Sequence, residues 1–240
     1  MTSKFKDLMA QLNDEEVTVT APNGSALAKQ VTLKDKKKLS DRYNFNQGWY
    51  DALLNTDAVL NEATEGEVFR LDPKEKRQIV EIGVYEGAST CFWSDFYLDH
   101  PESRLISIDP FTGSFEHHEN PENYPELGCI EYTARGNVAK SDNAAKVEII
   151  KGFSWFVFQE LVLRNDTDRW IDVLYIDGAH DSASVARDVA LFCPMVKPGG
   201  LVIFDDYAHP DVQRAVDMTL NAFATAQKAM FTGWQLAVKF

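Results

Sequence analysis

Five short apolar runs alternate with segments of helical length, and this alternation constrains the fold more than any other feature of the chain. The runs lie at residues 78–82, 105–108, 147–150, 171–176 and 201–204. Runs of four to six apolar residues are typical of strands buried on both faces, and the segments between most of them are long enough for a covering helix. The pattern therefore predicts an α/β fold, a Rossmann-like, doubly wound and mostly parallel sheet.

The segments around these runs predict the remaining organisation. Helices are expected at 89–98, 155–163, 182–192 and 211–223, and Pro198-Gly-Gly200 is expected to form a turn before the fifth strand. Residues 229–231 and 234–239 flank Thr232 and Gly233, which predicts an antiparallel C-terminal hairpin. Residues 111–145 are polar and poorly periodic, which favours a substrate-side lid or a mobile segment. We expect an N-terminal extension or lid at 1–70, with a helix at 49–63, and the main domain at 71–240.

The composition and net charge of the chain limit the kinds of partner it can bind. The 240 residues carry a net charge of -13, which disfavours nucleic acid and anionic membrane surfaces and leaves a small molecule as the expected partner. Three widely spaced cysteines predict neither a disulfide framework nor a zinc site, and no apolar run reaches the roughly 20 residues of a membrane span. We expect a soluble protein in a reduced, cytoplasmic setting; a homo-oligomer is left open.

The first apolar run leads into a glycine turn and a helix start. Gly83 and Gly87 let the backbone approach a ligand closely, and Ser89 offers a hydroxyl in the first helical turn. The spacing Glu-x-Gly-x-x-x-Gly differs from the Gly-x-Gly-x-x-Gly of a pyrophosphate site. Glu81 and Glu86 would repel a pyrophosphate and suit a positively charged ligand such as S-adenosylmethionine. A plain strand-to-helix connection is the alternative interpretation of this segment.

Polar or glycine-bearing positions follow the next two strands. Asp109 stands 22 positions beyond Gly87, where an acidic side chain can accept hydrogen bonds from ribose hydroxyls; a turn-initiating aspartate before Pro110 is the alternative. Gly152-Phe153-Ser154 could border an adenine, or Ser154 could cap a helix. The expected cofactor contacts are, in full, Glu81, Gly83, Tyr85, Gly87, Ser89, Asp109, Phe111, Gly152, Phe153, Ser154 and Asp177.

The fourth and fifth strands both end in aspartate. Asp177 and Asp205 are 28 positions apart, one strand-helix-strand unit, so they are expected to lie on neighbouring strands together with Asp206. Converging carboxylates need a neutralising cation, and an all-oxygen set favours Mg²⁺ or Ca²⁺ over zinc. Aspartates are also common helix caps and turn formers, which is the competing interpretation.

His180 is the best candidate general base, because its ordinary pKa is near neutrality and it follows Asp177 closely. Asp181 is the second candidate. A structural histidine and a helix-capping aspartate are the alternatives for these two positions. The run Glu116-His-His-Glu119 could also hold a metal, although such a run in a polar loop is more often solvated.

Taken together, these motifs resemble the class I S-adenosylmethionine-dependent methyltransferases. The resemblance covers residues 78–240 and rests on the motifs Glu81-Ile-Gly-Val-Tyr-Glu-Gly87, Asp109-Pro-Phe, Tyr175-Ile-Asp-Gly-Ala-His180, Lys197-Pro-Gly-Gly200 and Phe204-Asp-Asp-Tyr207. It implies a seven-stranded sheet with an antiparallel last strand.

Within this class the aspartates resemble those of metal-dependent sugar O-methyltransferases, which implies Mg²⁺ at Asp177, Asp205 and Asp206. Those enzymes can carry an acidic catalytic residue where this chain has Ala179. We therefore expect metal-assisted methylation of a small-molecule hydroxyl, and keep a catalytically inactive S-adenosylmethionine-binding module as the alternative. The glycine spacing weakens a third hypothesis, an NAD-dependent oxidoreductase.

Overall fold

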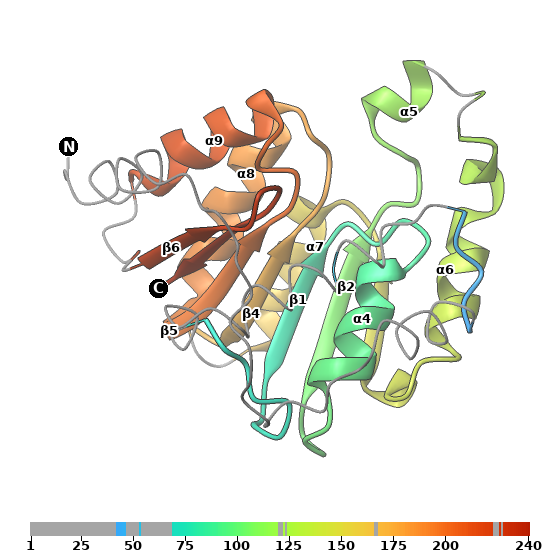
Figure 1. The fold of residues 1–240 in the computed structure, drawn as a ribbon, viewed down its shortest axis with the longest axis horizontal. Helices are drawn as coiled ribbons and strands as arrows, with labels where there is room; N and C mark the ends of the chain where they lie inside the picture. Colours follow the sequence, from blue (N-terminus) through green and yellow to red (C-terminus); the bar gives the residue numbers. More distant parts are fainter. Residues whose placement is uncertain are drawn as a thin grey trace, which may run out of the picture.

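A seven-stranded sheet forms the centre of the molecule (Figure 1). The computed structural model describes residues 42–46, 53, 69–119, 122, 124–165, 168–222, 226 and 228–240. The strands are β1 (Gln78–Ile82), β2 (Arg104–Asp109), β3 (Val147–Lys151), β4 (Ile171–Ile176), β5 (Val196–Phe204), β6 (Lys228–Phe231) and β7 (Leu236–Lys239). Their order in the sheet is β3-β2-β1-β4-β5-β7-β6.

The first five strands are parallel, as predicted, and β7 is antiparallel to both β5 and β6. The predicted C-terminal hairpin is thereby confirmed, with β7 beginning two residues later than expected. The strand order reverses between β1 and β4, and such a switch point is where open α/β sheets bind ligands, at the carboxyl ends of the strands.

Helices cover both faces of the sheet. Their bounds are α4 (Ala88–Tyr97), α5 (Phe115–Glu119), α6 (Ile130–Val138), α7 (Ser154–Arg164), α8 (Ser182–Phe192) and α9 (Pro210–Leu220), with short 3-10 helices η3 (Pro125–Cys129), η4 (Ala144–Lys146) and η5 (Cys193–Met195). No helix among the described residues is long and apolar enough to cross a membrane.

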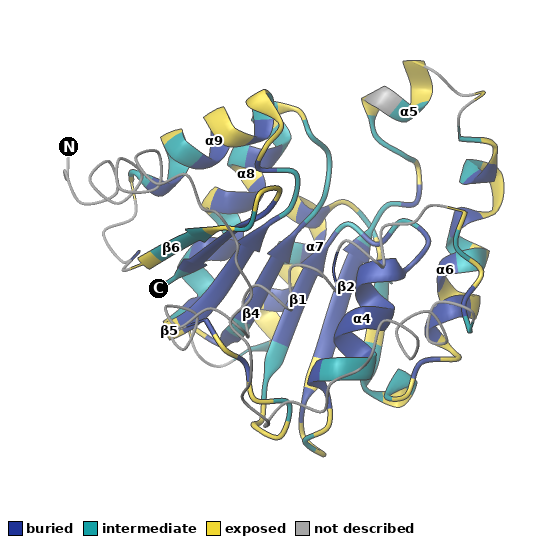
Figure 2. Cartoon of the chain, viewed as in Figure 1, coloured by how far each residue is buried: buried dark blue, intermediate teal, exposed yellow. Residues whose placement is uncertain are grey.

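Strand alternation divides the core into two layers. Ile79 packs with Phe92 and Trp93 of α4, whereas its neighbour Val80 belongs to the cluster formed with α7, α8 and α9. Both isoleucine and valine are fully buried, since a parallel sheet with helices on both sides leaves neither face in water (Figure 2). This is why the strands appear in the sequence as continuous apolar runs.

Two segments contain more regular structure than their sequences indicated. Residues 111–145 contain α5, η3, α6 and η4 rather than only irregular structure. The α6 helix buries Ile130, Ala134 and Val138 on one face, but its other positions are mostly polar, so the segment looked aperiodic. Residues 198–200 lie within β5, where the register to β4 shifts, and do not form a separate turn before it.

Helix α9 ends at Leu220, earlier than the predicted residue 223. The predicted helix at 49–63 lies outside the described residues, apart from Leu53.

A short N-terminal segment, residues 42–46, packs beside α4 and α6. The Tyr43 hydroxyl donates to Asp95 at 2.5 Å, and the Asn44 amide donates to Asn137 at 2.8 Å. Asn46 donates to Glu86 through both its backbone amide and its side chain. The segment is therefore fixed to the turn that follows β1.

Candidate active site

A pocket of about 420 Å³ opens at the carboxyl ends of the parallel strands, a size typical of small-molecule sites. Its walls come from the turn after β1, the loop after β2, the start of α7, the loop after β4, helix α8 and the ends of β5 and β7. Among the predicted residues, those that line it are Gly83, Tyr85, Ser89, Asp109, Phe111, Phe153, Ser154, Asp177, His180, Asp205 and Asp206.

The glycine turn packs directly against the loop after β4. Gly83 has φ +93°, and a Cβ added there would lie 1.7 Å from the carbonyl oxygen of Asp177. Gly87, with φ +85°, begins α4. Both glycines are needed for local geometry: the first for close backbone contact and the second for a left-handed conformation.

Asp109 holds the turn in place. Its Oδ2 accepts hydrogen bonds from the backbone amides of Val84 (2.7 Å) and Tyr85 (3.0 Å), and its Oδ1 accepts one from Phe111 (2.5 Å). Tyr85 and Phe111 both have positive φ, so the carboxylate supports two unusual backbone conformations. A carboxylate has about four acceptor positions. Three of these positions are occupied, so Asp109 has about one acceptor position left for a ligand.

The two glutamates of the turn differ in position. Glu81 is fully buried beneath the turn and does not line the pocket; the Thr90 hydroxyl donates to it at 2.6 Å. Burial raises the pKa of Glu81 to about 7. Glu86 lines the pocket, but its carboxylate accepts both hydrogen bonds from Asn46. Glu86 thus joins the N-terminal segment to the pocket wall.

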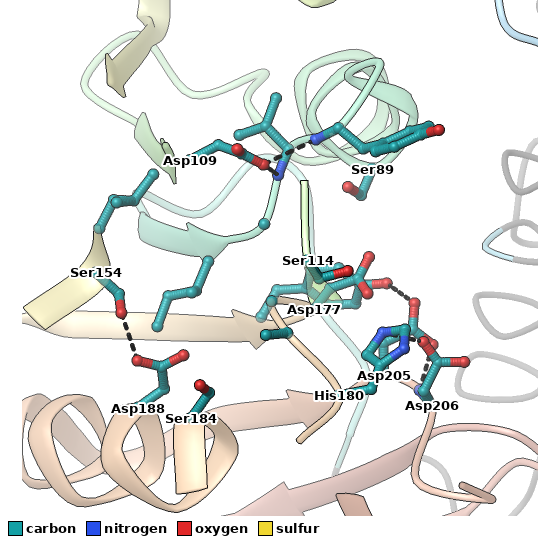
Figure 3. Close-up of a pocket in the computed structure, with 18 of the residues that line it drawn as sticks. Ser89, Asp109, Ser114, Ser154, Asp177, His180, Ser184, Asp188, Asp205 and Asp206 are labelled. Carbon is teal, nitrogen blue, oxygen red and sulfur yellow. Dashed lines mark hydrogen bonds and ion pairs between the residues drawn. The ribbon is translucent and has the colours of Figure 1, made fainter. Parts of the chain in front are cut away.

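At another part of the pocket the Ser154 hydroxyl donates to Asp188 of α8 at 2.5 Å (Figure 3). The N-cap position of α7 is Phe153, so Ser154 is not the helix cap considered as its alternative. Burial raises the pKa of Asp188 to about 6. Asp188 was not expected from the sequence, because a lone aspartate in a helix resembles a solvated one.

Asp177, His180 and Asp206 form a cluster whose ligand atoms lie within 4.8 Å of one another (Figure 3). His180 Nε2 lies 2.8 Å from Asp206 Oδ2. Burial, together with Asp205 and Asp206, raises the pKa of Asp177 well above its ordinary value. Two carboxylate oxygens and an imidazole nitrogen could hold a divalent cation, and a cation would relieve this repulsion.

Asp205 lies beside this cluster but is committed to other partners. Tyr175 donates to its Oδ2 at 2.5 Å and Gln235 donates to its Oδ1 at 2.9 Å. The geometry thus brings His180 into the set of possible ligands and makes Asp205 a supporting residue for Asp206, whose amide donates to Asp205 at 2.9 Å. Gln235 could not be found from the sequence, because it belongs to the hairpin, far from the motifs.

Other predicted residues lie outside the pocket. Asp181 caps α8, accepting a hydrogen bond from the Ser184 amide at 3.0 Å. Gly152 and Gly87 do not line the pocket; a Cβ at Gly152 would meet Val157 at 2.9 Å. From the run at 116–119, by contrast, His117 lines the pocket and stacks on Tyr85, with ring centroids 5.3 Å apart. The described part of this run contributes to no metal-binding group.

The comparisons with known proteins decide the family. A family model described as a methyltransferase domain matches residues 80–207, more than half of the chain. The chain belongs to this methyltransferase family. A curated relative, an uncharacterized protein of Acanthamoeba polyphaga mimivirus, is 29% identical over 150 residues, which cover 60% of this chain and 59% of that protein. The matched part of the methyltransferase thus spans about three fifths of that relative's length.

Solved structures show the same fold. CalS11, a calicheamicin methyltransferase, has a TM-score of 0.52 at 13% identity, over 91% of this chain and 99% of CalS11. The O-methyltransferase NovP has a TM-score of 0.55 at 20% identity, over 85% of this chain and 79% of NovP. TomG, an O-methyltransferase from Streptomyces achromogenes involved in tomaymycin synthesis, has a TM-score of 0.51 at 17% identity, over 100% and 99% of the two chains. The methyltransferase has the class I fold that its motifs predicted.

Proposed function

We propose that this methyltransferase transfers a methyl group from S-adenosylmethionine to a hydroxyl of a small molecule, with assistance from a divalent cation such as Mg²⁺. One observation carries the proposal: the cluster of Asp177, His180 and Asp206 lies in the same pocket as the Gly83 turn and Asp109. A nucleoside-binding turn and a cation site in one pocket fit a reaction that needs both a methyl donor and an activated hydroxyl.

The part of the pocket proposed to hold the cofactor lies at the carboxyl ends of β1 and β2. Gly83 and Ser89 line this part of the pocket, where the methionine part of the donor would lie, and Asp109 has about one acceptor position left for a ribose hydroxyl. Glu86 and Asp177 place negative charge near the expected sulfonium and amino groups. Known structures of TomG with S-adenosylmethionine support the same cofactor for this fold.

The part of the pocket proposed to hold the methyl acceptor lies at the carboxyl ends of β4 and β5. Asp177, Asp206 and His180 would hold the cation, which when bound lowers the pKa of a coordinated hydroxyl. Trp234 and Leu53 give this pocket apolar surface against which an acceptor can pack. His180 is also the proposed proton acceptor; in that role its imidazole is oriented by Asp206, and the carboxylates of Asp177 and Asp206 alone would hold the cation.

Calorimetry with S-adenosylmethionine is the first test. We expect binding in the micromolar range and, with Mg²⁺ and a panel of catechols, sugars and other hydroxylated acceptors, a product heavier by one methylene by mass spectrometry. Absence of binding at millimolar cofactor would contradict the proposal.

Two variants distinguish the role of the cation in turnover from the binding of the cofactor. Asp206→Asn removes a proposed ligand oxygen and is expected to lower Mg²⁺-dependent turnover at least about 100-fold while cofactor affinity stays within about threefold. Asp142→Asn, on an exposed carboxylate outside the pocket, is the matched control and should retain activity. Equal turnover in the two variants would show that Asp206 does not hold a cation that the reaction needs.

A second candidate function, a binding module without catalysis, is favoured by Ala179. This residue lines the pocket where related enzymes can carry an acidic catalytic side chain, and a methyl group cannot accept a proton. Cofactor binding without product from any acceptor in the panel, with or without Mg²⁺, would support this candidate. Any methylated acceptor would reject it.

A further inference from the structure

Asp188 is a buried acid that the proposed reaction does not use. It projects from α8, is only 3% exposed, and lines the pocket. Among the described residues, the Ser154 hydroxyl is the hydrogen-bond donor to its Oδ1, at 2.5 Å, and the Arg187 Nε atom lies 4.0 Å from the same oxygen. A buried carboxylate with so few donors is costly to maintain for structure alone. We therefore expect a hydrogen-bond donor of a bound ligand to contact the Asp188 carboxylate.

The position of Asp188 assigns it to the nucleobase end of the pocket. β2 and β3 are neighbours, with Asp109 paired to Lys151, and the Gly152 amide donates to the Asp109 carbonyl at 3.0 Å. Ser154 is two residues further on, which places it on the Asp109 side of the pocket, and the Ser154 and Asp188 pair is separate from the group of Asp177, Asp205 and Asp206 (Figure 3). The Asp188 Oδ2 atom lies beside Gly178, another pocket residue, 3.4 Å from where its Cβ would be.

The hydrogen-bond polarity of this pair determines which base it can bind. A serine hydroxyl has one hydrogen, and Ser154 directs it at Asp188, so its oxygen offers only lone pairs to a ligand. The ionised carboxylate of Asp188 is also an acceptor only. Together they form an edge without donors. Such an edge suits the 6-amino group of adenine and repels the 6-oxo group of a hypoxanthine or guanine base.

We propose that Asp188 binds the 6-amino group of the cofactor's adenine, that Ser154 positions the carboxylate, and that the pair excludes 6-oxo purines. The assignment rests on the proposed function, since it requires a nucleoside cofactor in this pocket. It adds a specificity-determining residue from α8, an element in which no site residue was expected.

The test compares two ligands by calorimetry: S-adenosylhomocysteine and S-inosylhomocysteine, which differ at the 6-position and in N1 protonation. The wild-type protein is expected to bind the adenosyl ligand at least about 100-fold more tightly. In Asp188→Asn the amide can present either an acceptor or a donor, so the ratio should fall below about tenfold. Ser154→Ala should lower the ratio by a smaller factor, because the carboxylate remains.

The matched control is Asp217→Asn. Asp217 accepts a hydrogen bond from the Tyr207 hydroxyl at 2.7 Å, as Asp188 does from Ser154, but does not line the pocket. This variant should keep the wild-type ratio. A wild-type protein that binds both ligands within threefold overturns the proposal without any variant, and so does a folded Asp188→Asn variant with the full wild-type ratio. Failure of the wild-type protein to bind either ligand would instead contradict the proposed function.

Discussion

The Tyr175 hydroxyl donates a 2.5 Å hydrogen bond to Oδ2 of Asp205, linking the interior of β4 to the acidic edge of the pocket. Tyr175 is 1% exposed and packs edge-on against Trp93 of α4, with ring centroids 5.8 Å apart. Because Gln235 binds the other carboxylate oxygen, Asp205 has a fixed orientation. The acidic cluster is thus supported from inside the protein.

Replacement of Tyr175 tests this support. Tyr175→Phe removes the donor to Asp205 and is expected to lower the free energy of unfolding by about 2 kcal/mol, because the remaining carboxylate oxygen loses a charge-assisted bond. Tyr207→Phe removes an equivalent donor to the more accessible Asp217 and should cost less. Urea unfolding at pH 7.5 measures both, and a larger loss for Tyr207→Phe would contradict the interpretation.

Substitution of Gly83 should be far more damaging than substitution of another glycine with positive φ. The Cβ of Gly83→Ala would overlap the Asp177 carbonyl oxygen, so we expect a loss above about 4 kcal/mol or failure to fold. Gly199 has φ +80° with no atom within 4 Å, so Gly199→Ala carries only backbone strain, about 1 kcal/mol. Thermal unfolding compares them; similar melting temperatures would exclude the close contact.

The pH dependence of stability should reflect buried acids. Glu81 has a folded-state pKa of about 7, above its unfolded value of 4.5, so the folded state binds its proton more tightly. The stability contributed by the protonated form is complete below about pH 4.5 and is lost as pH rises through 7, a change of about 3 kcal/mol. Asp188 acts in the same direction between its ordinary pKa and about 6.

Glu81→Gln should therefore flatten the fall in stability between pH 5 and pH 8 and raise stability at pH 8. Urea titrations of the cofactor-free protein at several pH values provide the measurement. An unchanged slope in the variant would mean that Glu81 ionises freely in the folded protein.

A divalent cation should stabilise the protein through Asp177. Mg²⁺ at 100 times its dissociation constant is expected to add about 2.7 kcal/mol to the free energy of unfolding. Asp177→Asn should abolish this gain, yet be more stable than the wild-type protein without metal at pH 8, because it removes the cost of burying a charged carboxylate and the repulsion from Asp205 and Asp206. Differential scanning calorimetry with EDTA or Mg²⁺ measures both stability changes. If Mg²⁺ still stabilises the Asp177→Asn variant, the cation binds at another site.

Much of the fold was predictable because its signals are local. The residues of β1 appear as one apolar run, and the α8 prediction matched its observed bounds. Asp109, Asp177 and Asp205 could be expected at one edge because each follows a parallel strand. The α6 helix was missed because only a narrow stripe of it is buried, and no local period distinguishes that stripe from a loop.

The site itself was less predictable, because its remaining members depend on packing across the sheet. Gln235 immediately precedes β7 and Asp188 lies in α8, and neither has a neighbouring motif that marks it. The direction of a carboxylate is also invisible in sequence: Asp205 and Asp206 are adjacent, but only Asp206 joins His180.

The hydrogen bonds from Asn46 to Glu86 have a practical consequence for dividing the chain. A fragment beginning at residue 71 would contain every family motif, yet it would leave the buried Glu86 carboxylate without two of its donors. In such a fragment the turn after β1 would be less well supported. A low affinity for S-adenosylmethionine measured on it would then reflect the missing residues and not the pocket itself. By the same linkage, a ligand that tightens the turn should slow amide exchange at residues 44 and 46.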